Sequence, residues 1–182
     1  MITHIAFLRA VNVGSNVLKM VQLREIFADL GFSDVKTYLQ SGNVAFGARG
    51  APSQVAAKIE KRVSEATRLP VSVIVRTPDE LRRTIAANPF AEEALAAPRT
   101  VHVTFLADPA PKAAAAALGK LQAGADRYHL AHREIYLHFP NGYGRTKLNN
   151  TALERALGLR ATTRNWSTVK ALDDMAHGRL GG

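Results

Sequence analysis

Four short polar clusters interrupt the apolar stretches of this 182-residue chain, and they hold the residue types best suited to binding a ligand. Three of them combine glycine with Arg, Lys, Asn or Ser, the fourth (residues 163–166) has Arg and Asn without glycine, and none contains Asp, Glu, Cys or His. Glycine lets a backbone approach a ligand closely, while cationic and amide side chains suit an anion. The clusters are residues 9–14, 40–43, 142–147 and 163–166.

The candidate ligand-binding residues combine positive charge with amide, hydroxyl and backbone groups that would orient a ligand. They are Arg9, Asn12, Gly14, Lys19, Gln40, Ser41, Gly42, Asn43, Arg145, Lys147, Arg164, Asn165 and Trp166. We expect them to bind an anionic small molecule, either a nucleotide or a phosphorylated metabolite. The clusters hold no nucleophile paired with a general base and no metal-ligand spacing, so no cofactor is indicated. Any reaction here would depend on positioning and electrostatics.

The two N-terminal clusters also have a structural interpretation. Asn12 and Gly14 suit a strand-to-helix turn, whereas together with Lys19 they would form a phosphate cradle at the start of a helix. Ser41, Gly42 and Asn43 suit a hairpin turn. Both interpretations remain open from the residues alone.

The two C-terminal clusters allow the same pair of interpretations. Residues 142–147 include two glycines and Tyr143, so they form either a solvated basic loop or a loop that closes on an anion. Asn165 precedes an expected helix and would cap it. Trp166 belongs to a residue type more often found in a core than on a binding surface.

The net charge of +9 raises the possibility of nucleic-acid binding. The excess is spread evenly, because residues 1–91 hold 12 Lys+Arg against 7 Asp+Glu and residues 92–182 hold 12 against 8. We therefore expect only weak, sequence-independent nucleic-acid binding. A nucleic-acid-binding module is the alternative function, although the RNA-binding aromatic signature is absent. A structural or oligomerisation protein without a ligand is the third.

Cysteine content and hydropathy bear on the compartment. The chain has no cysteine, no apolar run of membrane-spanning length and no basic leader at its N-terminus. These features fit a cytoplasmic protein without a membrane partner. They leave the oligomeric state undetermined.

The order of apolar strands and amphipathic helices predicts two copies of one unit. In the first, strands at 4–8, 35–39, 44–46 and 71–75 alternate with a helix around Leu23 to Leu30 and one that Pro52 opens. In the second, strands at 100–106, 127–130, 135–139 and 161–164 alternate with helices at 111–121 and 151–157, the latter with a capping box of Thr151 and Glu154. A helix follows at 167–175.

The predicted fold class is α+β, with two tandem ferredoxin-like βαββαβ units, a connecting helix and a C-terminal helix. Residues 1–77 form the first half, 78–99 connect the halves, and 100–182 form the second half with the C-terminal helix. Thr77 to Glu80 should open the connecting helix with a capping box. This topology places two clusters at one end of each half, and a single site would lie in a cleft between the halves.

Two histidines lie on strands of the second half. We expect His102 and His138 to point away from Val103, Phe105, Leu137 and Phe139, and to decorate an exposed sheet face with Tyr136. No third ligand converges with them, so no metal site is predicted.

The chain resembles a known bacterial family called domain of unknown function 1697. The resemblance rests on residues 8–14, 38–44, 88–90, 144–148 and 162–166. It implies an α+β fold of two ferredoxin-like halves and no particular activity. The family pattern has glycine where Ala10 stands here, and because alanine is strained at positive φ, this departure puts a left-handed conformation at residue 10 in doubt.

Overall fold

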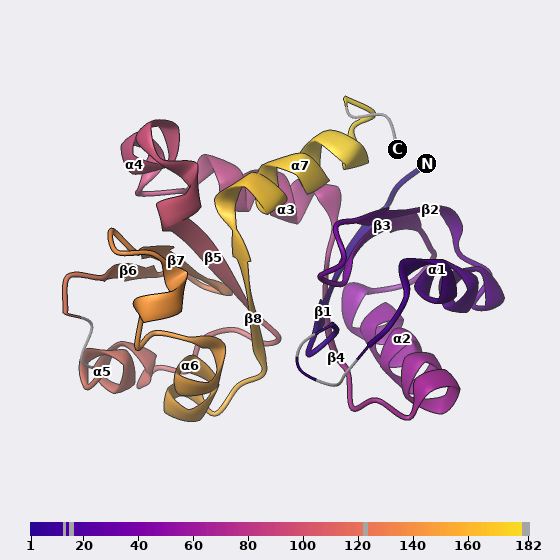
Figure 1. The fold of residues 1–182 in the computed structure, drawn as a ribbon, viewed down its shortest axis with the longest axis horizontal. Helices are drawn as coiled ribbons and strands as arrows, with labels where there is room; N and C mark the ends of the chain where they lie inside the picture. Colours follow the sequence, from indigo (N-terminus) through magenta and orange to yellow (C-terminus); the bar gives the residue numbers. More distant parts are fainter. Residues whose placement is uncertain (13, 15–16, 122–123, 180–182) are drawn as a thin grey trace. The chain divides into compact units, whose positions relative to one another are not determined.

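The computed structural model describes residues 1–12, 14, 17–121 and 124–179 (Figure 1). Val13 of the first polar cluster lies outside these residues. The chain divides into two compact units, of which the first contains Met1–Arg83 and the segment from Lys170 onward, and the second contains Thr84–Val169. Each unit has its own four-stranded antiparallel sheet, so the fold is mixed α+β.

The first unit is built on a sheet in which the strands lie in the order β2-β3-β1-β4. Its elements follow the chain as β1 (His4–Arg9), α1 (Met20–Asp29), β2 (Ser33–Tyr38), β3 (Asn43–Gly47), α2 (Pro52–Thr67) and β4 (Ser72–Arg76), before α3 (Pro78–Ala86) begins. Pro52 occupies the first turn of α2, as predicted. Gly31 takes φ = 73° just after α1, the conformation that ends a helix with least strain.

Helices α1 and α2 cover one face of this sheet (Figure 1). Leu8, Phe46 and Val73 from the sheet pack with Phe27 of α1 and Ile59 of α2 in one buried core. The buried residues of each helix recur at the spacing of one helical face, and burial of that face stabilises the helix. The two helices therefore cover one face of the sheet, and the polar loops lie at the ends of its strands.

The second unit repeats this arrangement of a sheet and covering helices. Its strands lie in the order β6-β7-β5-β8. After α4 (Ala91–Ala96) and a 3₁₀ turn, η1 (Pro98–Thr100), its elements are β5 (Val101–Leu106), α5 (Ala114–Gly119), β6 (Arg127–Leu130), β7 (Glu134–His138), the 3₁₀ turn η2 (Tyr143–Arg145), α6 (Asn150–Leu157) and β8 (Ala161–Asn165), from which α7 (Trp166–Ala176) leads on. Leu106 and Leu137 of the sheet pack with Leu118 of α5 and Leu153 of α6.

The strand register corrects the predicted position of His102. His102 lies opposite Leu137, and residues opposite each other in an antiparallel pair point to the same face. His102 therefore shares the helix-covered face with Leu137, while Tyr136 lies opposite Val103 on the other face. Both His102 and Tyr136 are buried, so the predicted exposed histidine face is wrong.

The two predicted capping boxes have different outcomes. At the start of α3, the backbone N–H of Thr77 donates to Glu80 Oε2 (2.8 Å) and that of Glu80 donates to Thr77 Oγ1 (3.2 Å), as predicted. At α6, the cap is Asn149, whose Oδ1 accepts from the N–H of Ala152 (3.0 Å). The predicted cap Thr151 lies within the helix, and Glu154 accepts from the N–H of Ala161 instead.

Ala10 has a left-handed backbone, with φ = 65°. The doubt raised by the missing glycine was therefore misplaced, because the chain keeps the conformation and has alanine in it. For an L-residue with a Cβ, this conformation costs about 1–2 kcal/mol. The first polar loop thus begins with a strained residue directly after β1.

We predict that Ala10→Gly raises the free energy of unfolding by about 0.5–1 kcal/mol, because relief of strain exceeds the added freedom of the unfolded chain. Ala28→Gly, at an exposed position within α1, is the control and should lower it by a similar amount. Urea denaturation of both variants measures the difference. Equal destabilisation by the two substitutions would show that residue 10 is not left-handed in solution.

Candidate functional site

The carboxamide of Asn12 holds together the polar loops of the first unit. Its Nδ2 donates to the carbonyls of Leu18 (3.0 Å) and Gln40 (2.6 Å), and its Oδ1 accepts from the N–H of Leu18 (2.8 Å). These bonds use both donor hydrogens and one acceptor site of the amide. Asn12 therefore joins the loop after β1 to the turn between β2 and β3.

Gly42 brings that turn against β1. Its carbonyl accepts from the N–H of Leu8 (2.8 Å), and its φ is 70°. A Cβ at this position would lie 2.8 Å from the Cβ of Leu8, which is too close for any side chain. Glycine is therefore required at position 42, because the backbone of the turn lies directly against the backbone of β1 at Leu8.

The neighbouring Asn43 is fully buried and is also engaged within the protein. Its Nδ2 donates to the carbonyl of Tyr38 (3.1 Å) and to Ser41 Oγ (2.8 Å). The structure therefore brings Asn12, Gln40, Ser41, Gly42 and Asn43 together at one end of the first sheet. Their bonds support the structural interpretation of both N-terminal clusters.

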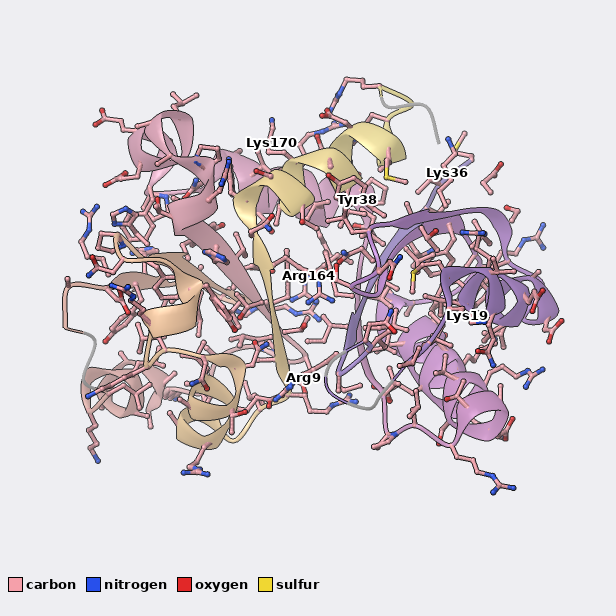
Figure 2. The ribbon with its side chains drawn as sticks, viewed as in Figure 1. Arg9, Lys19, Lys36, Tyr38, Arg164 and Lys170 are labelled. Carbon is pink, nitrogen blue, oxygen red and sulfur yellow. The ribbon has the colours of Figure 1, made fainter. Side chains whose placement is uncertain are left out.

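The remaining first-unit candidates surround these loops. Arg9 ends β1 opposite Ser72 of β4 and is partly buried. Lys19 precedes α1 and is exposed, and its side chain makes no cap to the helix (Figure 2). Gly14 is exposed with φ = 61°. Arg9 and Lys19 bring positive charge to this end of the first unit, but the amide side chains that would orient an anion are engaged within the protein.

The two C-terminal clusters meet at one end of the second sheet. Val101, the first residue of β5, lies opposite His138, where β7 ends. His102 lies opposite Asn165, where β8 ends. The loop after β7 and the exit of β8 therefore share the end at which β5 begins, as the predicted topology requires.

Tyr143 folds from its loop onto the start of β5. Its ring stacks on that of His102, with centroids 5.1 Å apart and planes 26° apart, and meets the ring of Phe139 edge-on at 5.7 Å. His102 and Phe139 also pack together, with centroids 5.2 Å apart. His102 and Tyr143 are not among the predicted ligand-binding residues, because their contact depends on the strand register.

Burial sets the protonation state of His102. Removal from water disfavours the imidazolium ion and lowers the pKa to about 4, and a hydrogen bond with the backbone of Thr100 offsets part of this. The ring is therefore neutral near pH 7, with one nitrogen that donates and one that accepts. Its Nδ1 is shielded from solvent and has no hydrogen-bond partner among the described residues.

Arg164 lies at the same end of the sheet but on the opposite face from His102, because it is opposite Val103 in the register. Its Nη1 donates to Thr162 Oγ1 (2.8 Å) and to the carbonyl of Thr163 (2.9 Å). Burial lowers the pKa of Arg164 to about 10, and the nearby Tyr143 partly offsets this. The Arg164 guanidinium therefore interacts electrostatically with Tyr143, although Arg164 is on the strand face opposite His102.

Asn165 and Trp166 begin α7. Asn165 Oδ1 accepts from the N–H of Thr168 (2.8 Å), so this residue is the predicted N-cap. Trp166 is the first helical residue and is partly buried. The capping bond commits the amide oxygen of Asn165 to the helix, so the predicted role of this residue in ligand binding would fall to its amide nitrogen.

Arg145 and Lys147 are exposed on the loop after β7. Between them, Thr146 Oγ1 donates to Asp126 Oδ2 (2.6 Å). An acid from 20 residues upstream therefore reaches a cluster that contains none in sequence. The contact fixes Thr146 in the middle of the loop, and the two cations are the residues on either side of it.

Metal-binding groups do not converge among the described residues. In that part of the chain no three His, Asp or Glu side chains are arranged to hold a metal ion. The same residues include no helix long and apolar enough to cross a membrane. The predicted common cleft lined by residues of both units stays a prediction.

Comparison with known proteins identifies the family. Residues 1–136 match the family described as "Protein of unknown function (DUF1697)", so the chain belongs to it. No curated protein matches. A solved structure, that of the conserved bacterial protein SP0830 from Streptococcus pneumoniae, is 20% identical, with a TM-score of 0.72 over 97% of this chain and 99% of that one. At this identity the likeness shows the fold alone, and residues 142–147 and 163–166 lie beyond the family match.

The depressed pKa of His102 predicts a loss of stability in mild acid. The unfolded state, with a pKa near 6.5, binds the proton more readily, so stability is complete above pH 6.5 and falls as the pH drops toward 4. The loss is roughly 3 kcal/mol, because one pKa unit corresponds to about 1.4 kcal/mol.

Urea denaturation between pH 7 and 4.5 measures this loss. His102→Phe should remove most of the His102 part of the slope, whereas His132→Phe, at an exposed histidine of the same unit, should retain it. Parallel pH profiles for the wild type and His102→Phe would contradict the assignment.

Proposed function

We propose that this is a cytoplasmic protein that binds an anionic small molecule, a nucleotide or phosphorylated metabolite, at the end of the second sheet where β5 begins. One observation carries the proposal. Tyr143 belongs to the loop that carries Arg145 and Lys147, and its ring covers the buried imidazole of His102. The Nδ1 of that imidazole has no hydrogen-bond partner among the described residues. Buried polar atoms without a partner are rare in folded proteins and often mark functional sites.

The charge of this loop suits a phosphate or carboxylate. Arg145 and Lys147 are exposed cations two residues apart on one short loop. Arg164 adds positive potential from the opposite face of the sheet. Asp126 is already engaged with Thr146, so it positions the loop as well as reducing the local charge.

The proposed role is binding, with any catalysis limited to positioning and electrostatic stabilisation. His102 stacks on Tyr143, and burial keeps it neutral rather than poised near pH 7. A neutral, buried imidazole serves better as a hydrogen-bonding group than as a general base.

The alternative of nucleic-acid binding through the sheets receives less support. Single-stranded RNA stacks on exposed aromatic residues of central strands in such sheets. Here the central strands β1 and β5 are buried, including Phe7 and Phe105. The net charge of +9 then supports only weak, salt-sensitive binding.

We also propose that each unit is a ferredoxin-like fold and that the two arose by internal duplication. The element order β-α-β-β-α-β recurs from β1 to β4 and from β5 to β8. Both sheets place the first and third strands of the unit at the centre and the second and fourth at the edges. Superposition of experimentally determined coordinates for the two units tests this proposal, and a poor fit of equivalent strands would contradict it.

Lys147→Ala should weaken the binding of pyrophosphate or ribose 5-phosphate by about 1.5–3 kcal/mol, because a charge-assisted contact is lost. The free energy of unfolding should change by less than about 0.5 kcal/mol, since the side chain is exposed. Isothermal titration calorimetry and urea denaturation measure the two quantities.

Lys120→Ala is the matched control, because it removes the same charge from an exposed position at the end of α5. It should leave affinity within twofold of the wild type. An equal loss in both variants would show that binding depends on diffuse net charge, and the absence of binding to the wild type would contradict the proposed function.

A further inference from the structure

An open pocket lies at the end of the first sheet opposite the loops that Asn12 joins. There β1 begins at His4, β2 begins at Ser33 and β3 ends at Gly47, and the register pairs His4 with Phe46 and Ser33 with Gly47. The pocket has a volume of about 520 Å³, and its lining comes from the segment before β1, the loop between α1 and β2, the end of β3 and helix α2. This volume suits a small organic ligand.

Leu30 and Phe32 form an apolar wall of this pocket. The Phe32 ring packs against the ring of Phe46 (centroids 5.0 Å apart, planes 31° apart) and meets that of Phe27 edge-on (5.8 Å, 74°), so two core side chains fix its position. Leu30 and Phe32 pack on the core and yet stay partly exposed. Aromatic rings prefer such stacked and edge-on contacts, so the wall offers a preformed surface to a ligand ring.

Arg49 and Lys58 line the same pocket, and neither makes a hydrogen bond or an ion pair with another described residue. The acids next to the lining residues in sequence already have cationic partners. Asp34 pairs with the N-terminal ammonium group, and Asp29 Oδ2 accepts from Arg62 Nη2 (2.7 Å). Since no lining residue is acidic, the pocket keeps two positive charges beside its apolar wall.

We propose that this pocket binds a small organic anion that carries an aromatic ring, such as an aryl carboxylate. The ring lies against Phe32 and Leu30, and the carboxylate lies with Arg49 and Lys58. Both parts of the ligand are needed, because exposed cations alone hold an anion weakly in water. The site is separate from the loop after β7, so this inference goes beyond the proposed function.

The first experiment locates the site and separates ring recognition from anion binding. Two-dimensional ¹H–¹⁵N NMR follows the full chain during titration with indole-3-acetate, with indole-3-acetamide, which has the ring without the charge, and with acetate, which has the charge without the ring. We expect indole-3-acetate to cause saturable shifts in the amides of residues 30–34 and 47–50, and to bind about tenfold or more tightly than either comparison compound.

Two results of this titration would overturn the inference. One is the absence of saturable shifts in residues 30–34 and 47–50, and the other is equal affinity for indole-3-acetate and either comparison compound. Shifts confined to residues 139–148 would overturn it as well, while leaving the proposed function standing.

The second experiment tests the charge of the pocket. Lys58→Ala should raise the dissociation constant of indole-3-acetate about fivefold or more, because a charge-assisted contact is lost. Lys61→Ala is the matched control, since it removes the same charge from an exposed position of α2 outside the pocket lining, and it should leave the constant within about twofold. Both lysines are exposed, so folding is retained. Unchanged affinity in Lys58→Ala, or equal weakening in both variants, would overturn the inference.

Discussion

Burial of the central strands is the constraint on which the rest of this structure depends. Every residue of β3 and β5 is buried, and so are the first five residues of β1. Polar groups on such strands must find partners within the protein. Thr104 does so through Thr163, whose hydroxyl in turn donates to Asn150 Oδ1, with both oxygen–oxygen distances at 2.7 Å. The polar clusters of both units accordingly lie at strand ends.

The two units use their strand ends differently. In the first, the carboxamides of Asn12 and Asn43 join adjacent backbone segments, and Gly42 permits the close approach to β1. In the second, the loop after β7 is fixed in its middle by the bond from Thr146 to Asp126, while its cations are exposed. Similar residue compositions therefore produce a rigid junction in one unit and a candidate binding loop in the other.

Sequence patterns predicted the elements well because each depends on local signals. Pro52, Gly31 and the pairing of Thr77 with Glu80 act within one helical turn, and the structure has all three as expected. The face of His102 was not predictable in this way. Every residue of β5 is buried, so burial does not distinguish its two faces, and only the pairing of His102 with Leu137 places His102 on the helix-covered face.

The contacts around the candidate site that the sequence did not predict are also long-range. Asp126 reaches the loop of Thr146 from another element, and the register separates Arg164 from His102 although the two lie at one end of the sheet. At α6, three polar residues in a row offered a cap, and Asn149 rather than Thr151 makes it. A capping box at Thr151 would need the side chain of Glu154, and that side chain accepts from the N–H of Ala161 instead.

The central claim is that the loop after β7 binds the ligand and that the loops joined by Asn12 are structural. The most direct test is two-dimensional ¹H–¹⁵N NMR of the full chain during titration with pyrophosphate. The account predicts saturable shifts concentrated in the amides of residues 139–148 and 163–168, with the amides of residues 40–43 unchanged. Saturable shifts centred on residues 9–19 and 40–43, with the second unit unaffected, would contradict it.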